Sequence, residues 1–355
     1  MRVLIYPFNE DFEPFIKYGM FMENMEITES LSPRGWGLQD KIIAKKIANK
    51  HDIKEVQWNN IDALLLIDSE VIVLTDQEII EVILISAQNG KKIIVNRNLN
   101  ENMFLNISDI CKKENVELID KRVKVQGEEL FDRRLQRIET PVVFVSGMGE
   151  KCNKFDVQMF LKTYLNNLDY KVCVVSSRTN AELFGIHSFP EFMLQHNLDE
   201  SSKIINFNHY IKELEVSEKP EIIIIGVPGG IMPVSEKHSE HFGVLAFEVF
   251  NAVKSDALLF CIHNNKYSKE YFDELQKLCQ YRFHTNIDAF VISNHAYDGF
   301  SLETEGQIKY LSFTDDEVDN SISEYPENVY GKSTYEKLAE SLLDTLADYA
   351  DCQVM

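Results

Sequence analysis

A lysine-containing loop between a buried strand and a helix is the segment best suited to chemistry. Val142 to Ser146 is a mainly apolar run, Phe155 to Leu168 has helical spacing, and the residues between them carry two glycines and two lysines. Glycines let backbone N–H groups turn towards an anion, a helix N-terminus adds partial positive charge, and a lysine can reach terminal phosphates. The pattern predicts a phosphate-binding loop whose ligand contacts are Gly147, Gly149, Cys152, Asn153, Lys154 and Phe155.

A second glycine-rich loop follows a buried strand later in the chain. Glu221 to Gly226 is strongly apolar, and the sequence Pro228-Gly229-Gly230-Ile231-Met232-Pro233 comes soon after it. Ligands of parallel sheets bind at the edge where the carboxyl ends of the strands meet. We therefore expect Gly229 and Gly230 to shape the wall opposite the Lys154 loop.

Both groups that would hold Mg²⁺ in a P-loop enzyme are replaced. Phe155 stands in place of the metal-binding Ser or Thr, Gly226 stands in place of an acidic residue, and Asn153 replaces a loop glycine. Asp156, Glu150 or a residue from elsewhere is left as a substitute, because phosphoryl transfer depends mainly on positioning and neutralised charge. The sequence thus argues against bound Mg²⁺, and it assigns no catalytic residue.

The order of these elements resembles the dethiobiotin-synthetase branch of P-loop proteins over residues 140 to 300. In that branch a buried strand runs into a Gly-Gly loop that ends near proline, and a later strand carries base recognition. Ala289 to Asn294 is similar to the later strand, so Asn294 is a candidate purine contact. The resemblance implies a degenerate P-loop fold with ATP or GTP as ligand.

Along its whole length the chain resembles a clostridial family of peptide maturation system proteins. The segments that carry this likeness are Gly147 to Asp156, Leu183 to Pro190, Phe207 to Tyr210 and Gly229 to Pro233. That family is associated with gene clusters encoding a small precursor peptide and a radical SAM maturase. The resemblance implies a pathway and two partners, the precursor peptide and the maturase, and it specifies no reaction.

The six cysteines are scattered and contain no CxxC pair, which predicts reduced thiols and disfavours both a disulfide framework and a structural zinc site. Cys152 would lie near a helix N-terminus, where a thiolate nucleophile is favoured. The alternative is that a small residue merely fits the loop.

Several other side chains also have a functional and a structural interpretation. His238 and His241, three positions apart, could form part of a metal site together with Glu240. No further ligand follows at diagnostic spacing, and the alternative is that they are solvated helix or loop residues. His187 and His209 are either ligand contacts or structural histidines. The segment Ser32-Pro33-Arg34-Gly35-Trp36-Gly37 is either a loop that grips a peptide or caps a pocket, or a turn packed on its own core.

Strand-like runs alternate with helical patterns in two blocks, which predicts two doubly wound, mainly parallel α/β domains. Residues 1–125 are expected to form a Rossmann- or flavodoxin-like domain, with strands at 2–7, 63–67, 92–95 and 116–119 and helices at 76–88 and 108–114. Residues 126–140 read as a connecting helix or linker.

Residues 141–355 are expected to form the P-loop-like domain. Strands are predicted at 142–146, 170–176, 221–226, 257–262 and 289–294, and helices at 155–168, 269–280 and 333–350. The acidic stretch 315–327 is expected to be a solvated loop.

The amino-acid composition disfavours several classes of binding partner. A formal net charge of −21 over 355 residues argues against nucleic acid, because phosphate recognition needs a basic surface. The acidity could recruit a basic peptide or protein, although solubility explains it equally well. Apolar runs are shorter than the roughly 20 residues of a membrane span, and the first residues lack a secretory pattern. We therefore expect a cytoplasmic protein without a membrane partner, and a homo-oligomer stays open.

Three functions fit these observations. The first is an accessory protein of peptide natural-product maturation that binds a nucleotide or phosphate ligand and holds peptide or maturase. The second is an ATP-dependent ligase or hydrolase that activates a carboxylate, as dethiobiotin-synthetase-like proteins do. The third is a structural pseudo-NTPase with an empty crevice.

Overall fold

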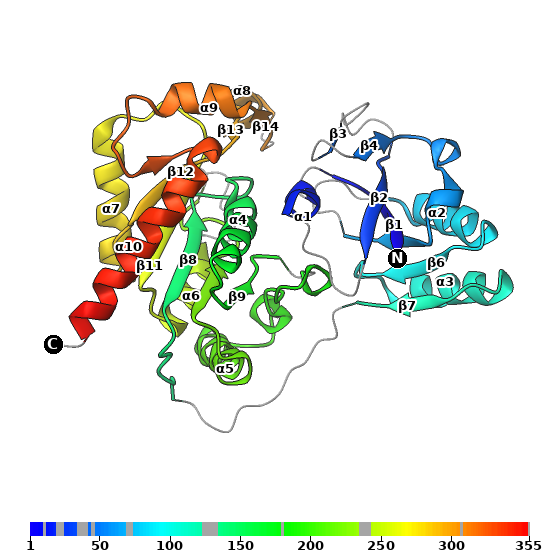
Figure 1. Ribbon diagram of the computed structural model, residues 1–355, viewed down its shortest axis with the longest axis horizontal. Helices are drawn as coiled ribbons and strands as arrows, with labels where there is room; N and C mark the ends of the chain where they lie inside the picture. The colour runs from blue at the N-terminus through cyan, green and yellow to red at the C-terminus, as the bar shows by residue number, and fades with distance from the viewer. Residues whose placement is uncertain are drawn as a thin grey trace. The chain divides into compact units, whose positions relative to one another are not determined.

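The computed structural model has two α/β units, each built on one large sheet (Figure 1). The structure describes residues 1–9, 12–18, 25–33, 42–43, 47–68, 74–122, 134–178, 181–233, 243–305 and 308–353. Unit 1 comprises Met1–Val125 and Asn180–Ile186, and unit 2 comprises Gln126–Thr179 and His187–Met355. The predicted class of mainly parallel α/β sheets is confirmed. Among the described residues, no helix has the length and apolar character to cross a membrane.

Unit 1 has a sheet in the order β3-β4-β2-β1-β5-β6-β7, parallel except for the β3–β4 pair. The strands are β1 (Arg2–Tyr6), β2 (Glu26–Leu31), β3 (Ile42–Ile43), β4 (Ile47–Lys50), β5 (Ala63–Leu66), β6 (Lys92–Val95) and β7 (Leu118–Asp120). The helices are α1 (Glu13–Tyr18), α2 (Asp76–Gln88) and α3 (Glu101–Lys113). Without β3, this order is the 3-2-1-4-5-6 order of a Rossmann fold.

Strand β2 lies next to the central strand although its sequence has no apolar run. Its Glu29 is buried and forms an ion pair with Lys50, and its Ser30 donates a hydrogen bond to Asn49 Oδ1 at 3.0 Å. Both partners lie on the neighbouring strand β4. Buried polar groups are tolerated when they are paired. The hydropathy pattern therefore missed this strand, because cross-strand partners compensate its polar residues.

Unit 2 has a six-stranded sheet in the order β15-β12-β11-β8-β10-β9, in which every pairing is parallel. The strands are β8 (Val142–Gly147), β9 (Val172–Val175), β10 (Ile222–Gly226), β11 (Ala257–Ile262), β12 (Ala289–Ile292) and β15 (Val329–Tyr330). A separate antiparallel hairpin pairs β13 (His295–Tyr297) with β14 (Tyr310–Ser312). The helices are α4 (Lys154–Asn167), α5 (Glu200–Glu218), α6 (Val244–Ala252), α7 (Lys269–Phe283), α8 (Gly299–Thr304), α9 (Asp315–Ile322) and α10 (Tyr335–Gln353).

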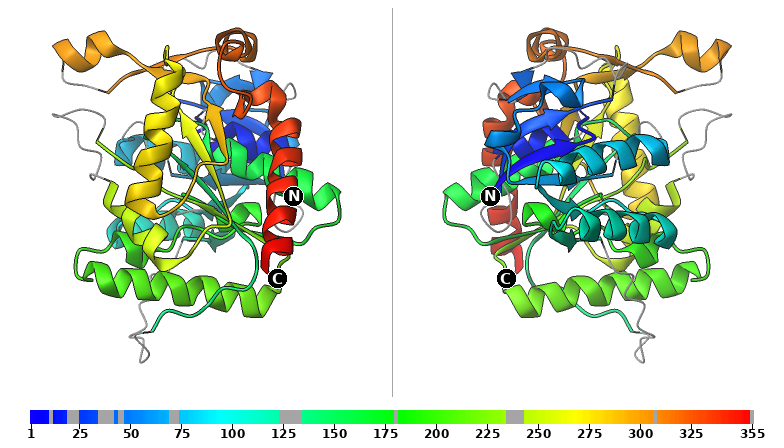
Figure 2. Two further views of the ribbon diagram at one scale, coloured as in Figure 1. Left: turned by 90° about the vertical axis from the view of Figure 1, so that its left-hand side faces the viewer. Right: turned by 90° about the vertical axis from the view of Figure 1, so that its right-hand side faces the viewer.

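Helices cover both faces of the unit 2 sheet, as a doubly wound fold requires. Apolar residues of α5, α6 and α7 pack on the face that carries Phe144, Ile225 and Phe260. Helices α4 and α10 pack together over the other face, and Figure 2 shows α7 and α10 on opposite sides of the strands. Strands β8, β10 and β11 are buried along their whole length, which explains their continuous apolar sequences.

One sequence expectation is wrong in this unit. The stretch predicted to be a solvated acidic loop contains helix α9, whose Thr314 and Glu317 form a reciprocal capping box. Three acidic residues occupy its first turn, where they interact favourably with the helix dipole. The charges that suggested a loop therefore stabilise the beginning of a helix.

The strand order of unit 2 reverses at β8, which makes the carboxyl end of this strand the expected position for a ligand. Strand β8 lies between β10 and β11. The chain fills the β9–β10 side first and then the β11–β12–β15 side. Crossover helices that leave in opposite directions open a gap at such a point, and ligands of α/β sheets bind there. The loops that follow β8 and β10 both reach this edge.

Candidate functional site

The two glycine-rich loops of unit 2 are in direct contact at the carboxyl edge. The amide of Ile231 donates to the carbonyl oxygen of Gly147 at 3.1 Å. An ideal Cβ placed on Gly230 would lie 2.2 Å from the carbonyl oxygen of Met148. Only glycine permits such an approach of one backbone to another. The structure therefore brings the predicted loops together, with Gly230 at their point of contact and Gly229 beside it.

The ammonium group of Lys154 lies between the two loops. Lys154 is the first residue of α4, and it is buried. Its Nζ donates hydrogen bonds to the carbonyl oxygens of Gly149, at 3.0 Å, and of Gly229. The ammonium thus joins one loop to the other. A ligand anion at this position would compete with these two carbonyl oxygens for the lysine.

Asn153 stands where the sequence pattern suggests a loop glycine, and its backbone adopts a conformation typical of glycine. Its φ of 63° and ψ of 11° lie in the left-handed region, which asparagine enters more readily than most residues. Its side-chain amide also donates to Asn294 Oδ1 at 2.8 Å. Asparagine at this position therefore makes the turn that glycine would make and adds a contact to the loop after β12.

Asn294, the expected base contact, lies beside the Lys154 loop through this bond. Its own Nδ2 donates to Asp315 Oδ1 at 2.8 Å and to the carbonyl oxygen of Phe313 at 3.2 Å. An amide nitrogen has two hydrogens. Recognition of a base through Nδ2 would therefore require Asn294 to exchange one of these partners.

A buried carboxamide packs against Gly226 at the end of β10, where the resemblance to P-loop proteins predicts an acidic residue. An ideal Cβ on Gly226 would lie 1.7 Å from Nε2 of Gln158, which projects from α4. The Gln158 side chain is fully buried, and neither of its polar atoms has a hydrogen-bond partner among the described residues. The absence of a side chain at residue 226 is thus coupled to the presence of glutamine at residue 158.

This coupling predicts the result of a double-mutant cycle. Gly226→Ala should lower the free energy of unfolding by about 1–3 kcal/mol, the usual cost of overpacking. In a Gln158→Ala background the same change should cost less than about 0.5 kcal/mol, because the added methyl group meets empty space. Urea denaturation of the four proteins measures both values. Equal costs in the two backgrounds would contradict the coupling.

The other groups near the start of α4 include two cations, Arg178 and Lys332, and two acidic residues, Asp156 and Glu150. Phe155, in place of Ser or Thr, has the guanidinium carbon of Arg178 4.5 Å from its ring centroid. The carboxylate of Asp156 is buried and lies 3.5 Å from Nζ of Lys332, so a cation of the chain already faces it. Glu150 is held through its carbonyl oxygen by His263 Nε2 at 2.7 Å.

His263 and Arg178 were not singled out in the sequence. His263 directly follows β11 and Arg178 follows β9 by three residues, so both lie near the carboxyl edge of the sheet. Burial lowers the pKa of His263 to about 4, which keeps its imidazole neutral at pH 7. Its Nε2–H donates to Glu150, while Nδ1 is a buried acceptor without a hydrogen-bond partner in the described chain. The sequence signal that could have identified His263 and Arg178 is that each follows a predicted strand closely.

The structure corrects the nucleophile interpretation of Cys152. Its thiol is fully buried, and Sγ donates to the carbonyl oxygen of Gly149 at 2.9 Å. Burial raises the pKa of this thiol even though Lys154 is near, so the thiolate is disfavoured. Cys152 and Cys261 crowd the position of a Cβ on Gly147. Cys152 is therefore a small residue that packs the loop.

Other residues singled out in the sequence have partners outside the Lys154 loop or lie outside the described residues. His187 Nε2 is 2.5 Å from Glu218 Oε1, and His209 Nε2 is 2.8 Å from the carbonyl oxygen of Arg134, so neither joins the contacts between the two loops. His238, Glu240 and His241 lie outside the described residues, as do Arg34, Gly35, Trp36 and Gly37.

Unit 1 has the corresponding strand-order reversal at β1, but the residues that follow this strand are rich in phenylalanine and not in glycine. The residues after β1 contain no glycine before Gly19. Phe8 and Phe12 are buried there, and Phe12 stacks on Phe15 with ring centroids 5.6 Å apart. A phosphate needs backbone amides and room at this point. The candidate phosphate site is therefore the pair of loops at the carboxyl edge of the unit 2 sheet.

Comparison with known proteins gives a fold neighbour. No protein-family model and no curated protein matches the chain. A solved DUF1611 family protein from Anabaena variabilis has a TM-score of 0.59 at 11% identity, covering 98% of this chain and 99% of that chain. Proteins described as oxidoreductases from Bacillus subtilis and Bacteroides fragilis match with TM-scores of 0.25 and 0.24, at 11% and 10% identity. They cover 48% of this chain each, and 53% and 52% of their own chains. The DUF1611 likeness shows a common fold.

Proposed function

We propose that unit 2 binds a phosphate-bearing ligand, ATP or GTP first, where the Lys154 loop meets the Pro228–Gly230 loop. The observation that carries this proposal is the position of Lys154. Its buried ammonium lies between carbonyl oxygens of both loops, at the start of a helix and at the strand-order reversal of the sheet. A lysine at a helix start and at a strand-order reversal favours a phosphate, which would replace the two carbonyl oxygens as the partner of the ammonium.

We further propose that binding does not depend on Mg²⁺. Phe155 and Gly226 provide no side-chain oxygen ligand, and Asp156 faces Lys332. The guanidinium of Arg178 on Phe155 supplies positive charge near the start of α4. Arginine binds phosphate oxygens through a planar fork of donors. Lys154 and Arg178 would therefore neutralise phosphate charge that Mg²⁺ neutralises in P-loop enzymes.

The biological setting that we propose is maturation of a ribosomally made peptide. The whole-chain resemblance to peptide maturation system proteins supports it. Without metal ligands, a nucleotide-bound unit 2 suits an accessory protein that holds the precursor peptide or the radical SAM maturase. An enzyme of the carboxylate-activating class is the second candidate. The buried Asp156 carboxylate favours it, because its oxygens accept no hydrogen bond among the described residues and could reach a metal ion if Lys332 moved.

Titration calorimetry tests the binding site. We expect ATP, GTP or ADP to bind the full chain saturably and with similar affinity with and without Mg²⁺. Lys154→Met, which keeps the buried stem and removes the charge, should weaken binding at least tenfold, or by about 1.4 kcal/mol. Lys171→Met changes an exposed lysine and the net charge equally, and it should leave binding unchanged.

The outcomes separate the candidates. Equal binding by wild type and Lys154→Met, or no binding by either, would overturn the phosphate-loop proposal. Phosphate release that needs Mg²⁺ and stops in Asp156→Asn would favour the enzyme over the accessory protein. A pull-down of precursor peptide or maturase that strengthens with nucleotide would support the accessory role.

A further inference from the structure

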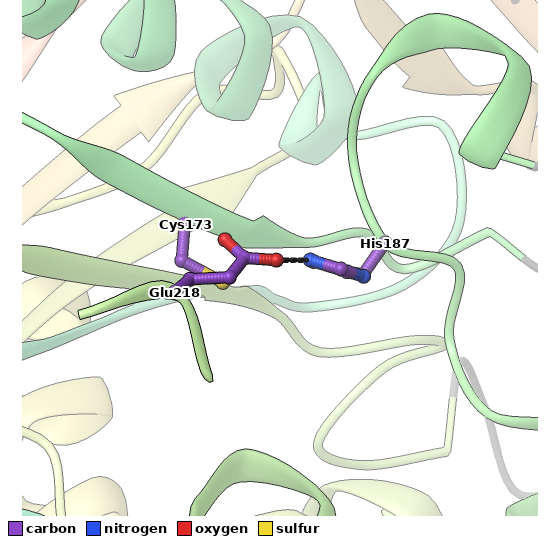
Figure 3. A group of neighbouring side chains, drawn as sticks. All are labelled: Cys173, His187 and Glu218. Carbon is purple, nitrogen blue, oxygen red and sulfur yellow. Dashed lines mark hydrogen bonds and ion pairs between the residues drawn. The ribbon is translucent and has the colours of Figure 1, made fainter. Parts of the chain in front are cut away.

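A cluster of three metal-ligand side chains lies at the edge of the unit 2 sheet. Figure 3 shows Cys173, His187 and Glu218 converging from three segments of the chain. Cys173 is on the edge strand β9, His187 forms a parallel bridge with Val175 of that strand, and Glu218 is the last residue of α5. Their ligand atoms all lie within 4.8 Å of one another. The cluster shares no residue with the Lys154 loop or the Pro228–Gly230 loop.

The backbone fixes these three positions independently of any side-chain contact. The amide of His187 donates to the carbonyl oxygen of Val174 at 2.9 Å, and the amide of Ser176 donates to His187 at 2.8 Å. Glu218 is placed by the end of a 19-residue helix, and Cys173 by pairing of β9 with β10. A binding site on rigid elements loses little conformational entropy when its ligand arrives.

The donor set selects the class of ion. A thiol sulfur, an imidazole nitrogen and a carboxylate oxygen are together the ligands of Zn²⁺ and similar borderline divalent ions, whereas Ca²⁺ and Mg²⁺ prefer oxygen alone. Three protein ligands with a fourth position left for water are typical of open zinc sites. Cys173 is buried, and the side chains of His187 and Glu218 are 30% and 36% exposed, so the cluster opens to solvent on one side.

The distances between the three ligand atoms would suit a tetrahedral ion after small shifts of the side chains. Ligands about 2.0–2.3 Å from a tetrahedral ion lie roughly 3.3–3.6 Å apart. His187 Nε2 and Glu218 Oε1 are 2.5 Å apart, within hydrogen-bond distance, so a proton on either atom can join them. An ion would take the place of that proton, which passes to Nδ1 or to solvent, and it would displace the thiol proton of Cys173 to solvent. Side-chain shifts of about 1 Å are enough.

We propose that Cys173, His187 and Glu218 bind one Zn²⁺ ion at the edge of β9. Neutral imidazole Nε2, the Cys173 thiolate and the Glu218 carboxylate supply two negative charges, which balance the ion. Lys162 on α4 interacts electrostatically with Cys173 and Glu218. Its positive charge opposes the ion, so Lys162→Met should tighten binding several-fold.

Cobalt substitution tests the site in the full-length protein. Co²⁺ added to the metal-free chain should give the visible bands of tetrahedral cobalt and a thiolate-to-cobalt charge-transfer band, with one ion bound per chain. Zn²⁺ should displace it. Cys173→Ala should abolish the charge-transfer band, and His187→Gln and Glu218→Gln should each weaken Zn²⁺ binding at least tenfold. Two control variants should bind Zn²⁺ as the wild type does. Cys279→Ala removes a different buried thiol, and His209→Gln removes a different imidazole, which lies on α5.

Two results would overturn the proposal. The first is absence of stoichiometric Co²⁺ or Zn²⁺ binding by folded wild-type protein. The second is binding that Cys173→Ala and His187→Gln leave intact. His187 is partly exposed, so its glutamine variant gives a folded test if the change at the buried cysteine prevents folding. Nucleotide binding at Lys154 should be unchanged in all these variants, which separates this site from the proposed phosphate site.

Discussion

Lys203→Met is expected to lower the free energy of unfolding of the protein by about 3–5 kcal/mol, the range for breaking a buried ion pair. Glu248 on α6 is fully buried, and neither of its carboxylate oxygens accepts a hydrogen bond from the described residues. Nζ of Lys203, on α5, lies 3.7 Å from Oε1 and faces it as the opposite charge. Without that charge, a carboxylate stays in the apolar interface of two helices. Urea denaturation at pH 7 measures the loss.

The double variant Lys203→Met/Glu248→Leu provides the matched control. Because it removes both charges, it should be at least as stable as the wild type. A loss as large as that of the single variant would show that Lys203 acts through its packing and not through its charge.

The same carboxylate gives a pH dependence. Burial raises the pKa of Glu248 above its ordinary value of 4.5, and Lys203 offsets part of that rise. The folded protein therefore holds this proton more tightly than the unfolded chain. The contribution of this group to stability is complete below about pH 4.5 and falls as the pH rises through the folded-state pKa. Unfolding of wild type and Glu248→Gln across pH 4 to 8 should show that wild type loses stability relative to the variant as the pH increases.

Gly230→Ala is expected to destabilise unit 2 by about 1–3 kcal/mol and to abolish nucleotide binding together. The added Cβ would lie 2.2 Å from the carbonyl oxygen and 2.8 Å from the carbonyl carbon of Met148. Both neighbours are backbone atoms, so relief requires the two loops to separate. Lys154 could then no longer bond to Gly149 and Gly229 at once. Calorimetry of unfolding and of ATP binding measures the two effects.

Gly299→Ala is the control for this change. It adds the same methyl group in unit 2, at the first residue of α8, where no atom of the described residues beyond its chain neighbours lies within 4 Å of the new group. Gly299→Ala should leave the free energy of unfolding and the free energy of ATP binding within about 0.5 kcal/mol of the wild-type values, as surface substitutions usually do. If Gly230→Ala behaved like Gly299→Ala, the contact between the loops would not hold them in place.

The candidate site shows how far sequence reasoning reached. The Lys154 and Gly229–Gly230 loops were predicted from glycine spacing beside buried strands, and the structure brings them together. Cys152 was left open between a nucleophile and a packing residue, because burial cannot be read from one position. Gln158 was missed, since its meaning depends on Gly226, which lies 68 positions away and touches it only in the folded sheet.

The sequence by itself determined the alternation of strands and helices and the two α/β blocks, because apolar periodicity is a local property of the chain. The bounds predicted for α2 agree with the structure, and those for β6 do too. Only the tertiary structure decided that β8 lies between β10 and β11, and that Cys173, His187 and Glu218 meet at one sheet edge. Strand order and such clusters depend on contacts between residues far apart in the chain, and no local pattern encodes those contacts.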